Sequence, residues 1–222
     1  MRFVFAIACF LTAAFMLLSA QSYLAQPITK PTPTGKSVFF DSDGREISNN
    51  EFVDIRMANF HYPDATIVKT LDDGTVEFRL QKIPQEGMTA HDFSVRTVDG
   101  ETISLSSLKG KVVVLNFWFI GCPACRGMEP QLNAFKEKFA GNDNVVFIAM
   151  TGDPAGEVRK YLKKEKFDYI QAADAKESLG MFNFGGYPKN IVIGKDGQIV
   201  YWRSTVRAWD KFESVVRAQM AK

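Results

Sequence analysis

Residues 112–125 read VVVLNFWFIGCPAC, from Val112 to Cys125. A continuous apolar run of this kind is typical of a central β-strand that is covered on both faces. Pro123 suits the first position of a helix, because its ring presets φ and it lacks an N–H that would have no partner there. The segment therefore predicts a buried strand that turns directly into a helix, with two cysteines at the junction.

The two cysteines at this junction are placed for thiol chemistry. Cys122 would lie at the helix N-terminus, where free N–H groups and the helix dipole favour a thiolate over a thiol. Cys125 follows about one turn later, within reach of Cys122, so the pair can exchange a disulfide with a partner. Pro123 and Ala124 bring no charge between the sulfurs, and we therefore expect a reductant or moderate exchanger rather than a strong oxidant.

Beyond this segment, hydrophobic periodicity predicts regular alternation of strands and helices from residue 88 onward. The expected elements are a hairpin at 93–98 and 101–105, a strand at 111–119, a helix at 123–139, a strand at 144–150, a helix at 157–166, a short strand at 169–173, a helical turn at 178–182, a strand–turn–strand unit at 188–193 and 198–203, and a helix at 209–221. This order implies an α/β fold in which helices flank both faces of a mixed central sheet.

The first 87 residues divide into three parts. Residues 1–22 combine Arg2 with a run of apolar residues and small residues near position 20, which fits a signal peptide; an uncleaved membrane anchor is the alternative. Residues 23–36 are rich in proline and threonine and read as a linker. Residues 37–87 predict a small α+β extension of two hairpins and a helix capped by Ser48 or Asn49, which we expect to pack on the domain at 88–222.

Composition narrows the class of protein. The chain has 222 residues, of which 46% are hydrophobic and 23% charged, and its net charge of +2 comes without a basic block, so we expect no nucleic-acid partner. It has three cysteines, and Cys9 lies in the apolar leader. A structural disulfide rarely closes so short a loop as Cys122–Cys125, because the stabilisation is small. The remaining pair therefore favours a redox role.

Several motifs together resemble the thioredoxin superfamily, and in particular its TlpA/ResA branch of thiol–disulfide oxidoreductases. The resemblance covers residues 88–222 and rests on a set of short motifs: Asn116-Phe117-Trp118, Cys122-Pro123-Ala124-Cys125, Pro130, Gly186-Tyr187-Pro188 and Asp196-Gly197. It implies a thioredoxin-like fold with a β-hairpin at the start of the domain.

The resemblance also implies roles for individual residues. Cys122 matches the exposed nucleophile, Cys125 the cysteine that resolves the mixed disulfide, and Pro188 the proline that follows a cis peptide beside them. Pro130 matches the proline that bends the helix. The residues expected to contact substrate are Trp118, Pro123, Ala124 and Tyr187. The redox-active disulfide Cys122–Cys125 would serve in place of a cofactor, and no metal is expected.

Three positions depart from the family pattern. Gly121 replaces the tryptophan that often precedes the first cysteine, and Asn116 stands where thioredoxins have a buried aspartate. Met128 occupies the position of a carboxylate that many relatives carry, and Glu129 follows it. We therefore consider two roles for Glu129, a proton acceptor for Cys125 or a solvated surface residue.

Other candidate residues have weaker signals. Lys189 reads as an exposed loop lysine that could steer an acidic partner. His61 and His91 are solitary and lack metal-ligand spacing to the cysteines. Trp202 and Trp209 are expected to be core or capping residues of the last hairpin and helix.

The sequence thus predicts an exported thiol:disulfide oxidoreductase of the periplasm or cell envelope. Residues 3–20 could anchor it to the membrane. Its partners would be an upstream membrane thiol reductant and protein disulfides, for example in cytochrome c or copper-site maturation, as the resemblance implies. Three alternatives stay open. They are a metal-binding chaperone, a peroxiredoxin-like antioxidant and a binding module with a structural disulfide, although the threonine and proline of a peroxidase loop do not precede Cys122.

Overall fold

The computed structural model describes residues 35–58 and 66–222. The expected signal peptide or anchor at 1–22, most of the linker and His61 lie outside these residues. Within the described ranges, no helix is both long and apolar enough to cross a bilayer.

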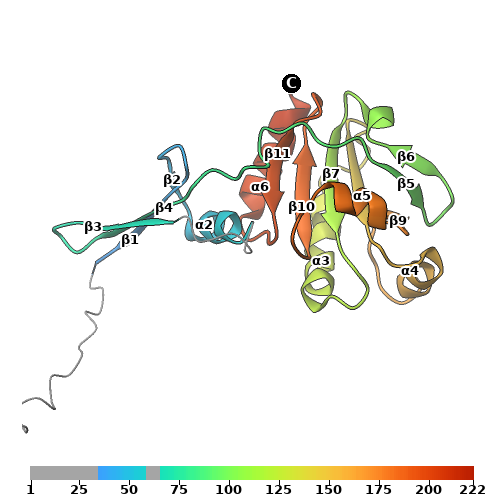
Figure 1. Cartoon of the computed structure of the whole chain (residues 1–222), viewed down its shortest axis with the longest axis horizontal. Helices are drawn as coiled ribbons and strands as arrows, with labels where there is room; N and C mark the ends of the chain where they lie inside the picture. Colours follow the sequence, from blue (N-terminus) through green and yellow to red (C-terminus); the bar gives the residue numbers. More distant parts are fainter. Residues whose placement is uncertain (1–34, 59–65) are drawn as a thin grey trace, which may run out of the picture.

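The main domain is built on one seven-stranded mixed sheet (Figure 1). Its strands, from one edge to the other, are β11 (Ile199–Arg203), β10 (Lys189–Ile193), β7 (Val112–Phe117), β8 (Val145–Met150), β9 (Ile170–Ala173), β5 (Ser94–Thr97) and β6 (Thr102–Ser104). Strands β7, β8 and β9 are parallel to one another, and every other neighbouring pair is antiparallel. The predicted mixed sheet and its leading hairpin, β5–β6, are confirmed.

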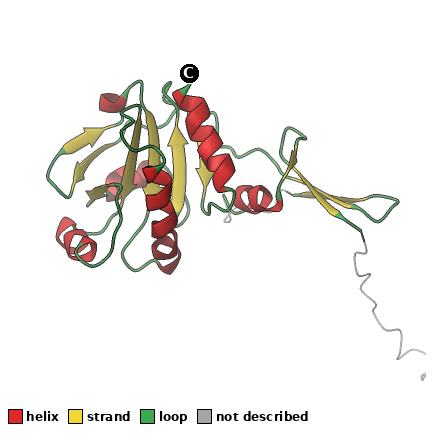
Figure 2. Ribbon diagram, turned by 180° about the vertical axis from the view of Figure 1, so that it is seen from behind, coloured by secondary structure: helices red, strands yellow, loops and turns green. Residues whose placement is uncertain are grey.

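Helices cover both faces of this sheet, as the order of elements predicted. They are η1 (Ser106–Leu108), α3 (Pro123–Glu137), α4 (Ala155–Leu162), α5 (Lys176–Met181) and α6 (Trp209–Met220). Figure 2 shows α3 and α6 side by side on one face, and α5 lies on the other (Figure 1). The split follows from strand geometry, because successive side chains point to opposite faces. Val114 joins the core under α3 and α6, whereas Val113 and Leu115 join the core under α5.

The extension forms a second, four-stranded sheet that projects to one side of the domain (Figure 1). Its elements are β1 (Ser37–Phe40), β2 (Glu46–Ile47), α2 (Asn49–Arg56), β3 (Ile67–Thr70) and β4 (Val76–Arg79). Both predicted hairpins and the helix capped by Ser48 are present. The sequence did not predict that β1 pairs with β4 in parallel, which joins the hairpins into the order β2-β1-β4-β3.

The boundary at residue 87 stays a prediction. Gly87 N donates to Ile199 O at 2.8 Å, and Ile199 N donates to Met88 O at 2.8 Å. Just before it, Glu86 forms an ion pair with Arg203. The chain is therefore attached to β11 on both sides of the expected boundary.

Candidate active site

The two cysteines lie where β7 gives way to α3. They are joined by a disulfide, and Cys122 is the N-cap of α3. Its Sγ accepts a hydrogen bond from the backbone N–H of Cys125 at 3.1 Å, and Pro123 takes the first helical turn. The first sulfur thus satisfies one of the amides that a helix N-terminus leaves without a partner.

The disulfide is buried, contrary to the expectation that Cys122 faces solvent. Cys122 is 4% exposed and Cys125 2%. The sulfur of Cys122 is bonded to Cys125 inside the core between the sheet and α3, so its exposure is low in the oxidised form. The residues around it at the surface are Gly121, Pro123 and Ala124, which are all exposed.

The peptide bond between Tyr187 and Pro188 is cis, as the resemblance implied. Pro188 immediately precedes β10, whose first residue Lys189 pairs with Phe117 at the end of β7. Pro188 therefore lies at the sheet end from which the chain runs to the disulfide. Tyr187 is half-buried and packs against the core cluster that contains both cysteines. Burial raises its pKa, and the nearby Asp153 raises it further.

Trp118 does not lie where we expected a substrate contact. It is fully buried, with its ring 5.2 Å from that of Tyr161 and 5.6 Å from that of Phe167. The next residue, Phe119, is 37% exposed instead, and its ring lies 5.2 Å from that of Tyr187. Alternation along the chain explains the exchange, because neighbouring residues of an extended segment point in opposite directions. Sequence reasoning missed Phe119 because both aromatics lie in one apolar run.

A buried amide pair lies beneath this end of the sheet. Asn116 Nδ2 donates to Asn190 Oδ1 at 2.9 Å, and Asn190 Nδ2 lies 3.5 Å from Met128 Sδ in α3. Asn116 and Asn190 are 2% and 1% exposed. Asn190 was missed by sequence reasoning, although an asparagine inside the apolar strand at 189–193 was a usable signal. The pair contributes hydrogen-bond donors but no charge.

Glu129 is buried, which contradicts its interpretation as solvated surface. It is 5% exposed and shares the buried face of α3 with Cys125, one turn earlier. The hydroxyl of Tyr161 donates to both carboxylate oxygens, at 2.8 and 2.9 Å. Burial raises the pKa of Glu129, partly offset by this hydrogen bond. Sequence reasoning did not predict this pairing of Tyr161 with Glu129.

Asp153 holds the loop that leads to Cys122. Its Oδ2 accepts from the backbone N–H of Ile120 at 2.7 Å and from Thr151 Oγ1 at 2.9 Å. This carboxylate, which we did not predict, fixes the loop from the segment that follows β8. Its only sequence signal was the Gly-Asp-Pro turn at 152–154.

Lys189 is a further correction, because it is fully buried rather than exposed. Its Nζ donates to the carbonyl of Ala58, at 2.5 Å, and to Ser204 Oγ, at 2.8 Å. Burial lowers its pKa to about 8, and Arg203 adds to the effect. Trp202 is buried in the core as expected, and Trp209 begins α6 partly buried.

His91 is exposed. In the part of the chain that the structure describes, no group of three or more potential metal ligands comes together.

Comparison with known proteins shows to which family the chain belongs. The family model described as Redoxin matches residues 85–218. The chain belongs to the Redoxin family. Among curated relatives, a thioredoxin-like protein, YneN, of Bacillus subtilis is 32% identical over 117 residues, which are 52% of this chain and 69% of the relative. The thiol-disulfide oxidoreductase ResA of Bacillus cereus is 32% identical over 118 residues, 52% of this chain and 68% of the relative.

Solved structures agree with the Redoxin assignment. A thioredoxin-family thiol:disulfide interchange protein from Chlorobium tepidum TLS is 26% identical and covers 62% of this chain and 99% of its own, with a TM-score of 0.53. The thioredoxin domain of a thiol-disulfide oxidoreductase from Bacteroides vulgatus is 25% identical, covers 59% and 97%, and also has a TM-score of 0.53. This Redoxin protein is a TlpA/ResA-like thiol–disulfide oxidoreductase with a thioredoxin-like fold.

Proposed function

We propose that the chain reduces disulfides of exported proteins through Cys122 and Cys125. The observation that carries the proposal is the disulfide at the N-terminus of α3. The cis peptide before Pro188 lies at the same end of the sheet. A sulfur at a helix N-terminus is stabilised as a thiolate, which is the attacking species in disulfide exchange. A buried proline before β10 also leaves no N–H competing for the sulfurs.

The reaction proceeds in two exchanges from the dithiol form. The Cys122 thiolate attacks one sulfur of the substrate disulfide, so that a mixed disulfide forms and one substrate thiolate leaves. The Cys125 thiolate then attacks Sγ of Cys122, which restores the Cys122–Cys125 disulfide and releases the second substrate thiolate. Two electrons pass to the substrate, and a dithiol reductant must return them before the next cycle.

Glu129 supplies the proton acceptor for the second exchange. Cys125 is buried and must lose a proton before it attacks, and a buried carboxylate with a raised pKa is a stronger base than an exposed one. Tyr161 holds the carboxylate in place by donating to both oxygens. Glu129 therefore serves as the carboxylate that many relatives carry at the position of Met128.

The surface that contacts the substrate consists of Pro123, Ala124, Tyr187 and Phe119. Phe119 replaces Trp118, which we first expected to contact the substrate. An export signal or anchor at residues 1–22 places this surface in the periplasm or cell envelope. The substrates are protein disulfides, such as those of cytochrome c or copper-site maturation, and the electron donor is a membrane thiol reductant.

Insulin reduction with dithiothreitol as donor tests the proposal. We expect turnover by the wild type, none above background for Cys122→Ser, and trapped mixed disulfides for Cys125→Ser. Wild-type rates in both variants would refute the proposal. Faster reduction of hydrogen peroxide than of insulin would favour the peroxiredoxin-like alternative, and tight metal binding by the dithiol form would favour the chaperone.

A further inference from the structure

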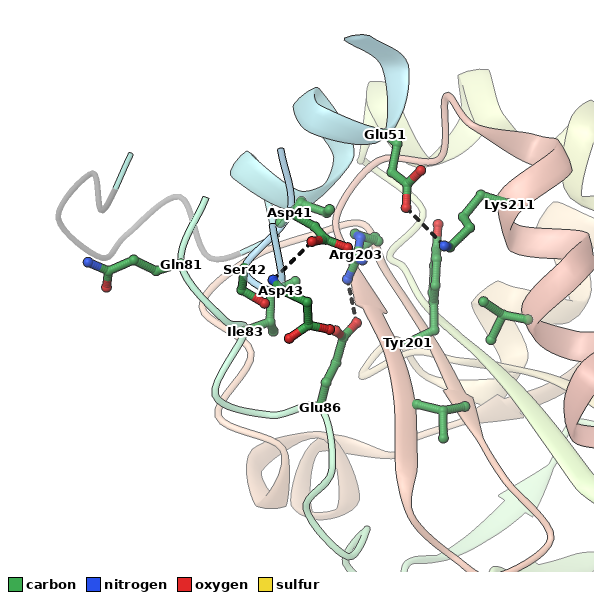
Figure 3. Close-up of a pocket in the computed structure, with 13 residues that line it drawn as sticks. Asp41, Ser42, Asp43, Glu51, Gln81, Ile83, Glu86, Tyr201, Arg203 and Lys211 are labelled. Atoms are coloured by element: carbon green, nitrogen blue, oxygen red, sulfur yellow. Dashed lines mark hydrogen bonds and ion pairs between the residues drawn. The ribbon is translucent and has the colours of Figure 1, made fainter. Parts of the chain in front are cut away.

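The extension meets the redox domain at the edge of the large sheet, through α2. This helix packs beside β11, the edge strand. Figure 3 shows a cleft at the junction, lined by residues of both parts, with ion pairs between Glu86 and Arg203 and between Glu51 and Lys211. The contacts that matter most for the active site are two buried ones outside this cleft.

The first buried contact is the one between Lys189 and Ala58. Ala58 is fully buried just beyond the C-terminal end of α2, where carbonyls lack helical partners and the helix dipole is negative. Lys189 Nζ donates to this carbonyl at 2.5 Å and to Ser204 Oγ at 2.8 Å, and lies 5.2 Å from the centre of the Trp202 ring. A buried ammonium needs such partners, so this contact is held strongly.

The position of this contact follows from strand register. Lys189 pairs with Phe117 on one side, and Asn190 pairs with Arg203 on the other. Lys189 thus stands in the last row of the sheet, directly after the cis peptide before Pro188. The end of α2 is therefore hydrogen-bonded to the residue that follows the cis-proline.

The second buried contact is made by Asp54, which is 1% exposed. Its Oδ1 accepts from Thr205 Oγ1 at 2.9 Å, and its Oδ2 accepts from the backbone N–H groups of Arg207 and Ala208 at 2.7 and 2.9 Å. These residues form the loop between β11 and α6. Because β11 runs antiparallel to β10, this loop leaves the sheet at the end where β10 begins.

We propose that α2 is a positioning element for substrate binding: by holding both the cis-Pro188 loop and the loop at 204–208, it shapes the surface that receives a polypeptide substrate beside the disulfide. The inference rests on the proposed function of Cys122 and Cys125. It gives the extension, most of which lies outside the residues matched by the Redoxin family, a part in selecting protein substrates.

Lys189→Met tests the proposal, since it keeps an unbranched side chain of nearly the same length and removes its donors. We expect KM for insulin to rise about tenfold. The kcat and the rate with oxidised glutathione should change less than twofold, and the reduction potential of the disulfide should stay at the wild-type value. A polypeptide must contact the positioned loops, whereas glutathione needs only the sulfurs. Ser204→Ala, which removes one acceptor and leaves Lys189 in place, should raise KM for insulin about threefold.

The matched control is Lys211→Met, which breaks the ion pair of α2 with α6 but touches neither loop, and should leave KM unchanged. An unchanged KM in folded Lys189→Met, or an equal loss with glutathione, would overturn the proposal. Should that variant fail to fold, an unchanged KM in Ser204→Ala overturns it instead. A wild type that cannot reduce insulin would refute the proposed function, which is a separate outcome.

Discussion

Glu129 carries a carboxylate in a place where solvation cannot stabilise its charge. Its side chain shares the buried face of α3 with Cys125, and its hydrogen-bond donor is the Tyr161 hydroxyl. Tyr161 in turn packs against Trp118, whose indole Nε1 has no hydrogen-bond partner. Burial among these side chains raises the pKa of the carboxyl, although the Tyr161 hydrogen bond and Arg126, which lies over the Tyr161 ring, act to lower it.

Glu129→Gln should slow the second exchange about a hundredfold, because the Cys125 proton loses its acceptor. In the wild type this rate rises with pH as Glu129 deprotonates, at a pH above the ordinary range of a glutamate since its pKa is raised. The variant should lack that inflection. Stopped-flow release of a pre-formed mixed disulfide measures both effects.

Glu137→Gln is the matched control, because Glu137 lies on the same helix as Glu129 but is exposed to solvent. It should keep the wild-type profile. An unchanged pH profile in Glu129→Gln would exclude the carboxyl as the acceptor.

Lys189 should make the free energy of unfolding depend on pH. Burial lowers its pKa to about 8, whereas the unfolded chain has an ordinary lysine pKa near 10.4. Between these values the unfolded chain binds more protons, so stability rises with pH, by at most about 3 kcal/mol. The difference in unfolding free energy between wild type and Lys189→Met should therefore increase from about pH 8 to about pH 10.4 in urea titrations. A flat difference over that interval would contradict the prediction.

At the scale of the element, α6 begins without a capping side chain of its own. Its N-cap is Ala208, which has no hydrogen-bonding group. Asp54 of α2 accepts from the backbone N–H of Ala208, far away in the sequence. One carboxylate thus joins the end of α2 to the start of α6.

Asp54→Ala should lower the free energy of unfolding by about 2–4 kcal/mol, because a buried charged acceptor and three hydrogen bonds are lost. Glu51→Ala, on the same helix, breaks only an ion pair of 3.2 Å and should lower it by less than about 1 kcal/mol. Chemical denaturation compares the two. Equal losses would show that Asp54 contributes no more than an ordinary ion pair.

At the scale of the whole molecule, the two sheets differ in how much core protects them. Every residue of β7 and β10 is buried. In the small sheet β3 is an exposed edge strand, with Ile67 58% and Val68 57% exposed. The aromatic cluster of Phe39, Phe52 and Phe78 is the main apolar contact of that sheet with α2.

Hydrogen exchange measured by mass spectrometry should report this difference. We expect amides at 112–117 and 189–193 to exchange only through global unfolding, and those at 67–70 to exchange orders of magnitude faster through local opening. Peptides covering α2 should follow the large sheet, since Asp54 and Lys189 attach the helix to it. Protection of β3 equal to that of β7 would contradict this picture.

The order of elements could be predicted from the chain alone, because the patterns that set it are local. Apolar runs and alternation located the strands, and Cys122-Pro123 located the start of α3, within a few residues. The parallel pairing of β1 with β4 was not predicted, because pairing between distant strands leaves no mark in either segment.

The sequence by itself determined the cysteine pair and the α/β order, since both depend on neighbours along the chain, and the family resemblance supplied the cis-proline candidate. Only the tertiary structure decided that Trp118 is buried and Phe119 exposed, that Glu129 faces Tyr161, and that Lys189 ends against Ala58. Burial and hydrogen-bond partners come from segments remote in sequence, and residue type alone does not state which segment will cover a given side chain.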